Sequence, residues 1–208
     1  MTTARKTENP RAQLSRERII AAAMELVDRD GLQALSMRRL GDELGFKGGS
    51  LYYYVSGKEE VQEELIKQMF SKFEPVDSAA LSWKEYLVAV MKAFRQVGIA
   101  HPHVFQLYAH RPWSEEVGRK DRLVLREAGL DQDTASYALR ILVDFVTGFV
   151  LRNDVANSFP EFRGAQTTEP GVDLEYAFTL GLESILEGIE KVRLSASAGK
   201  SHRVPDAR

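Results

Sequence analysis

Hydrophobic residues recur every three or four positions along most of the chain, which is the spacing of amphipathic helices. The first such stretch is preceded by Ser15 and ends at Asp30-Gly31, and its apolar face comprises Ile19, Ile20, Ala23, Met24 and Val27. A serine before the stretch and a glycine after it are the usual ends of a helix. Because no alternating run of useful length predicts a strand, we expect an all-α protein.

Cap residues locate the short helices that follow. Ser36 begins a second helix that Gly45 closes, and a third short segment spans residues 47–54. Ser56-Gly57-Lys58-Glu59 has the form of a capping box and predicts a helix over residues 56–73. Residues 75–81 are expected to be a linker.

Longer helices are predicted for the rest of the chain. Ser82-Trp83-Lys84-Glu85 is a second capping-box pattern and opens a long core helix. The later helices are expected over residues 102–110, 114–128, 133–152 and 173–194. Residues 153–172 are predicted to be a mobile loop, and residues 195–208 a disordered tail, because the tail has little apolar content to pack.

Small residues line one face of the last predicted helix. They are Ala177, Gly181, Ser184 and Gly188. Glycine inside a helix is about 1 kcal/mol less favourable than alanine, so two glycines in one stripe indicate close approach of another backbone. The stripe predicts a dimer interface, with packing inside the same chain as the alternative.

Composition narrows the class of protein. The 208 residues are 44% hydrophobic and 28% charged, as in a globular protein, and the absence of cysteine excludes disulfides and thiolate metal sites. No apolar run approaches the roughly 18 residues of a membrane span, and the polar N-terminus has no secretory signal, so we expect a cytoplasmic protein that binds no membrane. The net charge is −2. Residues 1–58 hold 10 Lys and Arg against 7 Asp and Glu, so this part has a net positive charge although the whole chain is acidic.

The segment around the second and third helices has the chemistry of a nucleic-acid interface. Two short helices joined by a turn near Gly45 form the arrangement in which a second helix enters a DNA major groove. Arg38 and Lys47 are candidates for base contacts, and tyrosine hydroxyls suit phosphates. The full candidate set is Ser36, Arg38, Arg39, Lys47, Gly48, Gly49, Ser50, Tyr52, Tyr53 and Lys58.

Residues 15–65 resemble the DNA-binding domain of TetR-family transcriptional regulators. The residues that carry the resemblance include Gly31-Leu32, Leu35-Ser36-Met37-Arg38-Arg39-Leu40, Leu44-Gly45, Gly49-Ser50-Leu51-Tyr52-Tyr53-Tyr54-Val55 and Lys58-Glu59. The resemblance implies a helix-turn-helix domain of three helices over residues 15–60, with the third helix at DNA and Lys58 at a phosphate. The chain departs from the family pattern at Gly48-Gly49, and at Tyr54, where His is common. The arm over residues 1–14 is interpreted either as a minor-groove contact or as a solubilising tail.

Residues 76–194 are similar to the ligand-binding and dimerisation domain of the same family, and this domain is expected to span residues 61–194. Ala100-His101-Pro102-His103-Val104-Phe105 is similar to the tetracycline-repressor-like branch. The resemblance implies a homodimer that binds a palindromic double-stranded DNA operator and a small-molecule effector. Aromatic residues with a few polar groups are the candidate pocket: Phe94, His101, Phe105, Tyr108, His110, Trp113, Tyr137, Arg140, Phe145 and Phe149. These aromatics also fit an ordinary core, and Arg140 with Asp144 fits an ordinary helical ion pair.

The sequence favours a ligand-responsive transcriptional repressor that is not an enzyme. It contains no G-x-S-x-G elbow, P-loop or G-x-G-x-x-G motif, and we expect no catalytic residue and no cofactor. A metal site is not expected either, because His101 and His103 do not share a helical face. The alternative is a helical partner- or ligand-binding module without specific DNA binding. The net negative charge of the chain favours this alternative, because DNA-binding proteins usually carry a net positive charge.

Overall fold

The computed structural model describes residues 14–71, 73, 76–77, 79–112, 118–155 and 171–201. All regular structure in these ranges is helical, which confirms the predicted fold class. The chain forms two compact units, residues 1–67 and residues 68–208. The boundary between the units lies inside one helix, α4 (Lys58–Ser71), whereas the sequence analysis divides the domains at residue 60.

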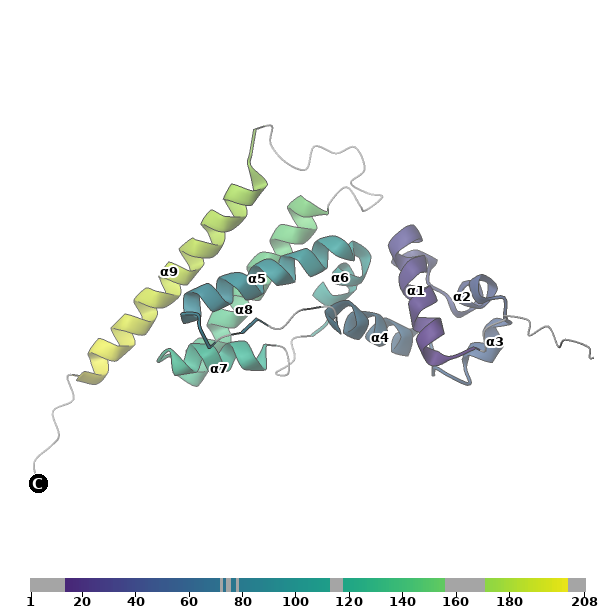
Figure 1. The fold of residues 1–208 in the computed structure, drawn as a ribbon, viewed down its shortest axis with the longest axis horizontal. Coiled ribbons are helices and arrows are strands. Elements are labelled where there is room, and N and C mark those ends of the chain that lie inside the picture. The colour runs from purple at the N-terminus through teal and green to yellow at the C-terminus, as the bar shows by residue number, and fades with distance from the viewer. Residues whose placement is uncertain are drawn as a thin grey trace, which may run out of the picture. The chain divides into compact units, whose positions relative to one another are not determined.

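The first unit is a small cluster of helices (Figure 1). Its elements are α1 (Arg16–Asp30), the 3-10 turn η1 (Leu32–Ala34), α2 (Met37–Leu44), α3 (Gly48–Leu51) and the first part of α4. The hydroxyl oxygen of Ser15 accepts from the Arg18 amide at 3.2 Å, and that of Ser36 accepts from the Arg39 amide at the same distance. Both predicted caps are therefore present. The apolar face of α1 is buried, which confirms its predicted stripe.

The third helix is shorter than the sequence suggests. It ends at Leu51, where the amides of Tyr54 and Val55 both donate to the Leu51 carbonyl, at 2.9 and 3.1 Å. The backbone thus closes into a turn in place of continuing as a helix to residue 54. Leu51 is fully buried and attaches this turn to the core of the unit.

The cap of α4 also differs from the prediction. The Ser56 amide donates to Glu60 Oε2 at 2.7 Å, so the reciprocal acceptor is Glu60 and not Glu59. Arg16 on α1 forms an ion pair with the same carboxylate. The S-x-x-E pattern therefore lies near the start of the helix, but α4 begins at Lys58, one residue later than a cap at Ser56 implies. The glutamate in the third helical position is consequently Glu60 and not Glu59.

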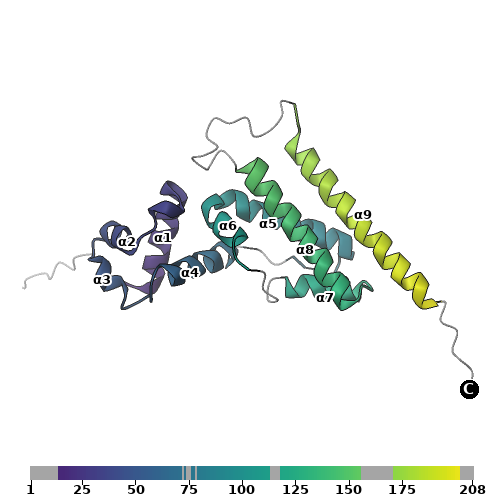
Figure 2. The same ribbon diagram turned by 180° about the vertical axis from the view of Figure 1, so that it is seen from behind.

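The second unit contains the longer helices. They are α5 (Trp83–Ala100), α6 (Pro102–Ala109), α7 (Arg119–Glu127), α8 (Gln132–Phe149) with its π-helical continuation η2 (Val150–Asp154), and α9 (Leu174–Ser201). In both views α5, α8 and α9 lie beside one another, and α7 packs on α8 (Figures 1 and 2). The predicted capping box of Ser82 and Glu85 is present at the start of α5. Fully buried Leu87, Phe105, Leu139 and Phe178 belong to the core of this unit.

Two boundaries in this unit differ from the predictions. Asp131 caps α8, since its carboxylate accepts from the amides of Asp133 and Thr134 at 3.1 and 3.0 Å, so the helix starts slightly before residue 133. Helix α9 continues to Ser201 and does not end near Leu194, because no proline interrupts the sequence before residue 205. The predicted start of α7 at Ser114, residues 1–13 of the predicted arm, most of the predicted 153–172 loop and residues 202–208 lie outside the described residues.

Among the described residues, one helix has the length and composition of a membrane span. It covers Gln132–Asp154, with a mean hydropathy of 1.4 over an 18-residue window, a stretch that the sequence analysis does not single out. The core helix of a globular domain passes the same test. Leu139, Leu142 and Val146 on this helix are fully buried, in a helix that contacts α5, α7 and α9, so it serves as a core helix of the second unit.

Candidate nucleic-acid interface and effector cavity

Helices α2 and α3 meet at two glycines. A Cβ atom added to Gly41 would stand 2.8 Å from the Gly48 amide nitrogen, and one added to Gly48 would stand 2.9 Å from the Met37 carbonyl oxygen. These distances are too short for any side chain at either position. Gly45, with φ of 76° and ψ of 27°, supplies the left-handed turn between the two helices. The helix-turn-helix crossing is therefore a backbone-to-backbone contact.

The side of α3 away from this crossing is open. A Cβ atom on Gly49 would meet nothing within 4 Å, and Lys47 at the start of α3 is exposed. Tyr53 is 88% exposed and Tyr52 is 55% exposed. Arg38 on α2 is exposed as well. The first unit therefore presents two cations and two tyrosine hydroxyls around an unobstructed short helix, groups that suit phosphates and base edges.

Arg39 has a different environment from Arg38. Its guanidinium forms an ion pair with Asp30, a carboxylate that also accepts from Arg29 at 3.0 Å. Arg29 in turn pairs with Glu43 at 2.5 Å. The hydrogen bond from Arg29 lowers the pKa of Asp30. This network links α1 to α2, so Arg39 stabilises the unit in addition to being a candidate for DNA contact.

An apolar cavity of about 310 Å³ lies within the second unit. Its apolar lining consists of Phe70, Phe73, Val90, Met91, Phe94 and Val143. Gly118, Tyr108 and Asp121 also line it, so the ionisable groups that the described residues contribute to the lining are a phenol and a carboxylic acid. We call this the aromatic cavity. Burial raises the pKa of Tyr108 to about 12, so its hydroxyl stays protonated and can donate a hydrogen bond.

The carboxylic acid of the aromatic cavity is bound to a neighbouring tyrosine. The Tyr86 hydroxyl of α5 donates to Asp121 Oδ1 at 2.8 Å. Burial raises the pKa of Asp121, and the tyrosine hydrogen bond and the cations Lys120 and Arg122 act weakly against this. Burial also raises the pKa of Tyr86. Asp121 is thus a carboxyl group in a poorly hydrated site, the type of environment found at ligand-binding and functional sites.

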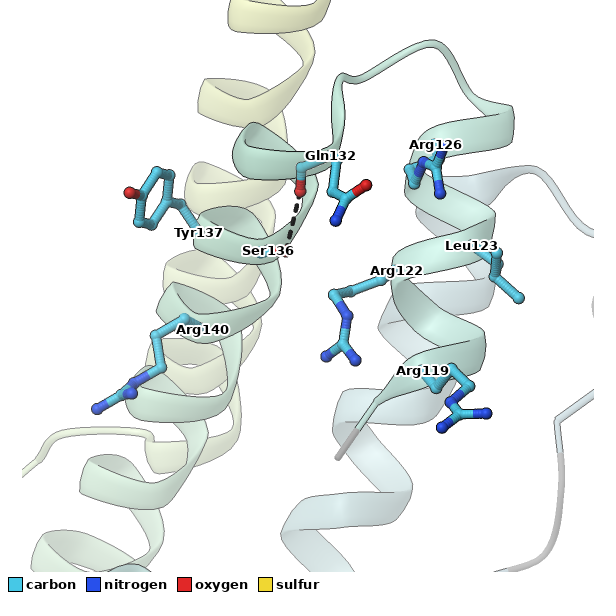
Figure 3. A pocket seen from close by; sticks show the side chains of 8 residues that line it. All are labelled: Arg119, Arg122, Leu123, Arg126, Gln132, Ser136, Tyr137 and Arg140. Atoms are coloured by element: carbon cyan, nitrogen blue, oxygen red, sulfur yellow. Dashed lines mark hydrogen bonds between the residues drawn. The ribbon is translucent and has the colours of Figure 1, made fainter. Parts of the chain in front are cut away.

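A second hollow, the arginine groove, lies between α7 and α8 and has a volume of about 440 Å³. Figure 3 shows Arg122 pointing from α7 toward α8, with Arg119 and Arg126 on the same helix to either side of it. Tyr137 and Arg140 also line the groove, but Figure 3 shows both side chains pointing away from α7. This groove is distinct from the aromatic cavity.

Two family models match the chain. "Bacterial regulatory proteins, tetR family" matches residues 19–65, and "Tetracyclin repressor-like, C-terminal domain" matches residues 74–176. The chain belongs to the TetR family of transcriptional regulators. The first match covers the helix-turn-helix of the first unit. The second covers α5, α6, α7 with the preceding Gly118, and α8, which together provide all of the named lining of the aromatic cavity except Phe70 and Phe73.

Individual relatives agree with this assignment. An HTH-type transcriptional regulator of Saccharopolyspora erythraea is 37% identical over a segment of 108 residues. This segment covers 51% of this chain and only 45% of the length of that protein. The class C tetracycline repressor of Escherichia coli is 27% identical over 89% of the chain and 94% of its own length. The TetR-family protein ActR of Streptomyces coelicolor, solved in complex with actinorhodin, has a TM-score of 0.73 at 26% identity, covering 88% of this chain and 98% of its own.

The predicted pocket residues of this TetR-family chain do not share one cavity. Phe94 and Tyr108 line the aromatic cavity, and fully buried Phe105 packs beside them, with ring centroids 5.1 Å from Phe94 and 5.9 Å from Tyr108. His101 lines a separate groove with Met69. The remaining predicted residues lie outside the aromatic cavity or outside the described part of the chain.

Tyr137 and Arg140 are on the exposed side of α8. Tyr137 is 70% exposed, and Arg140 pairs with Asp144 at 2.8 Å, with both side chains at least half exposed. This is the helical ion pair that the sequence analysis gives as the alternative. His110 is exposed, with Nδ1 2.7 Å from the Gln106 carbonyl oxygen, and Trp113 lies outside the described residues.

Phe145 and Phe149 belong to a cluster around a buried arginine. They pack against Phe178 of α9, with ring centroids 5.7 and 5.2 Å away. The Arg95 guanidinium lies 4.4 Å from the Phe178 ring centroid and pairs with Asp154 at 2.8 Å. Aromatic periodicity alone does not separate rings that line a cavity from rings that pack on a cation.

The small-residue stripe of α9 is divided between two environments. A Cβ atom on Gly181 would stand 2.6 Å from the Phe145 ring, so Gly181 packs against α8 of the same chain. Ala177 is half-buried. Ser184 and Gly188 are exposed, and a Cβ atom on Gly188 would meet nothing within 4 Å. The intrachain alternative therefore holds for Gly181, while the other end of the stripe remains open.

Sequence analysis missed Phe70, Asp121 and Arg95. Phe70 stands in a helix assigned to the connection between domains, and Asp121 is one acid in a highly charged segment. Arg95 is buried, but its position in α5 differs from that of a surface arginine only because apolar residues, Met91 and Ile99, stand four positions away on either side. That spacing is the one signal that could have identified it.

Proposed function

We propose that this TetR-family chain represses transcription as a homodimer on a palindromic operator and that a small, largely apolar or aromatic effector in the aromatic cavity releases it. The observation that carries the proposal is the division of chemistry between the two units. The first unit has an exposed cationic and tyrosine-rich helix-turn-helix, and the second has an apolar cavity with two polar groups. The complex of ActR with actinorhodin supports the class of effector.

On the DNA side, we assign base contacts to Arg38 and Lys47 and backbone contacts to Ser36, Ser50, Tyr52, Tyr53 and Lys58. Arg38 and Lys47 are exposed, and Lys58 is the first residue of α4. Gly49 lets the open side of α3 approach a groove closely, whereas Gly48 faces α2 and sets the crossing of the two helices. The two recognition helices of a dimer read half-sites roughly 34–36 Å apart.

Effector binding is proposed to act by population shift. Helix α4 contains Lys58 in the first unit and Phe70, which lines the aromatic cavity, in the second. An effector that binds better to one arrangement of α4 favours that arrangement, and only a difference in affinity between the two states produces a shift. Release follows when the favoured arrangement no longer fits the half-site spacing.

The proposed dimer face lies on α8 and α9. These adjacent helices expose large apolar side chains, namely Tyr137, Ile141, Tyr176 and Leu180, and the open glycines Gly148 and Gly188. Exposed apolar groups on two neighbouring helices are characteristic of an interface. Replacing Ile141 and Leu180 with glutamate is expected to give monomers in sedimentation velocity, and a dimer of unchanged stability would contradict the assignment.

Fluorescence anisotropy with the DNA upstream of its own coding region tests the function directly. The wild-type protein is expected to bind one fragment specifically at moderate salt, and Lys47→Ala with Arg38→Ala is expected to abolish specific binding. Thermal shifts in the presence of aromatic compounds identify effectors, whose addition should release the fragment. Ligand binding without any specific DNA complex would instead favour the alternative, a helical ligand- or partner-binding module.

A further inference from the structure

Asp121 lies at a position that the fold fixes tightly. Gly118, the residue before α7, has φ of 66°, and a Cβ atom on it would stand 2.3 Å from Leu139 Cδ2. Only glycine satisfies both conditions, so the start of α7 is held against α8. Asp121 follows in the first turn of that helix, where the helix dipole favours a negative charge.

Among the described residues, the carboxyl group of Asp121 has one hydrogen-bond partner, the Tyr86 hydroxyl. Oδ1 accepts from the Tyr86 hydroxyl, whereas Oδ2 lies toward Gly118, 3.1 Å from where a Cβ atom there would stand. Within the described residues Asp121 forms no ion pair. The neighbouring Lys120 is engaged elsewhere, since its Nζ donates to the Val76 carbonyl at 2.8 Å and lies 5.4 Å from the Tyr86 ring centroid.

Aromatic rings surround the same space. Phe70 and Phe94 are stacked with centroids 6.0 Å apart, and Tyr108 stands edge-on to them at 5.1 and 5.8 Å. All three line the aromatic cavity together with Asp121. Ring faces attract cations by their quadrupole, and this attraction grows where water is excluded. A positively charged group is the one class that gains from both the rings and the carboxylate.

We propose that the aromatic cavity selects an organic cation, a molecule whose aromatic or apolar body packs among Phe70, Phe94 and Tyr108 while its ammonium group binds Asp121 Oδ2. The selection rests on the proposed function, because it names the chemical class of the effector. Burial raises the pKa of Asp121 because it destabilises the charged carboxylate. A cation that pairs with the carboxylate offsets this destabilisation. An anionic molecule of the same size is rejected by like charge.

A size-matched series tests the selection with the full chain in the absence of DNA. The probes are 1-naphthylmethylamine, 1-naphthalenemethanol and 1-naphthoic acid, which are cationic, neutral and anionic at pH 7, and the measurement is the dissociation constant by calorimetry. The wild-type protein is expected to bind the amine about tenfold or more tightly than the alcohol, and the acid most weakly. Both the amine and the alcohol can donate a hydrogen bond to Asp121, but only the amine adds a charge–charge attraction and a cation–π contact in this poorly hydrated site. Asp121→Asn should bring the amine and the alcohol to within roughly twofold of each other.

Two further variants control for charge and folding. Glu127→Gln makes the same charge change at an exposed site on α7 and should keep the preference for the amine. Tyr86→Phe removes the hydrogen bond to Asp121 but keeps the carboxylate, so it should also keep the preference. If Asp121 served only to hold Tyr86, Tyr86→Phe and Asp121→Asn would lower the melting temperature alike and leave selectivity the same, which would overturn the proposal.

The remaining outcomes separate this proposal from the proposed function. Equal binding of all three probes, or binding of none, overturns cation selection at this cavity. If an uncharged compound releases the operator and the protein shows no preference for the amine, the proposed repressor function holds and the proposal of cation selection is wrong. Absence of any specific DNA complex removes repression, whereas the preference measured without DNA still decides the chemistry of the cavity.

Discussion

Arg95 and Asp154 form a bidentate ion pair between α5 and the π-helical end of α8, with Nε···Oδ2 and Nη2···Oδ1 distances of 2.8 Å. Their side chains are 8% and 7% exposed. Glu175 of α9 binds the remaining nitrogen, Nη1, at 2.6 Å but is 67% exposed. One buried arginine therefore connects three helices, with most of the burial on the Asp154 side.

Removing one partner of this pair is expected to destabilise the second unit strongly. Asp154→Asn removes the buried counter-charge of Arg95 and leaves it with the exposed carboxylate of Glu175. Loss of one partner of a buried pair lowers the free energy of unfolding by about 3–5 kcal/mol. Glu175→Gln is the matched control and should lower it by less than about 1 kcal/mol, because that carboxylate is exposed. Urea denaturation followed by circular dichroism measures both, and equal effects of the two variants would contradict the assignment.

The two adjacent glycines of α3 are expected to respond in opposite ways. Gly48→Ala forces a methyl group to 2.9 Å from the Met37 carbonyl oxygen, and overpacking of this kind destabilises by about 1–3 kcal/mol. Gly49→Ala meets open space and should stabilise the helix by about 0.5–1 kcal/mol. Thermal unfolding of the two variants provides the comparison. A neutral Gly48→Ala would mean that α2 and α3 are not in backbone contact.

Acid is expected to weaken the first unit through Glu60. The hydrogen bonds from Ser56, followed by that from Arg16, lower the pKa of Glu60 from 4.5 to about 2. A carboxylate whose pKa falls on folding stabilises the folded state above its unfolded pKa, and that contribution is lost as the pH drops from about 4.5 toward 2. Urea unfolding at a series of pH values in this window should show a steeper loss for the wild type than for Glu60→Gln. Parallel pH profiles of the two proteins would count against this role.

Arg38 and Lys58 are expected to affect DNA binding in different ways. Arg38→Ala should change the ranking of operator variants, since a bidentate base contact discriminates by about 1–3 kcal/mol. Lys58→Ala should weaken all sequences alike and reduce the slope of log affinity against log salt by about one. Anisotropy titrations over an operator library at several salt concentrations separate the two effects. A uniform loss for Arg38→Ala would reassign it to the phosphate backbone.

Much of the fold could be predicted from the sequence because its signals are local. Ser15, Ser36 and Ser82 cap the helices that they precede, and Gly45 closes α2. A cap depends on residues within one turn, which a sequence displays directly. The end of α3 at Leu51 was harder to predict, because burial of Leu51 and the turn after it depend on contacts with other helices.

The candidate sites could be predicted only in part, for the same reason. Exposed Arg38 and Lys47 stand in a local motif, and the sequence singles them out. The aromatic cavity combines Phe70 of α4, Phe94 of α5 and Asp121 of α7, which are brought together by packing and share no spacing in the chain. Phe145 and Phe149 have the same helical spacing as residues that line a pocket, so the sequence predicts them there. In the structure Phe145 packs on Phe178 and Phe149 packs on Arg95.

The unobstructed position of Gly49 also bears on how this regulator acquires new target sites. Gly41 and Gly48 are fixed by the crossing of α2 and α3, so selection for stability retains them. No packing contact constrains Gly49, and a side chain at this position would extend into open space beside Lys47. A longer side chain at Gly49 can therefore add a base contact without disturbing the packing of α2 and α3. Variants at this position, in evolution or in a laboratory library, are a route to new operator sequences.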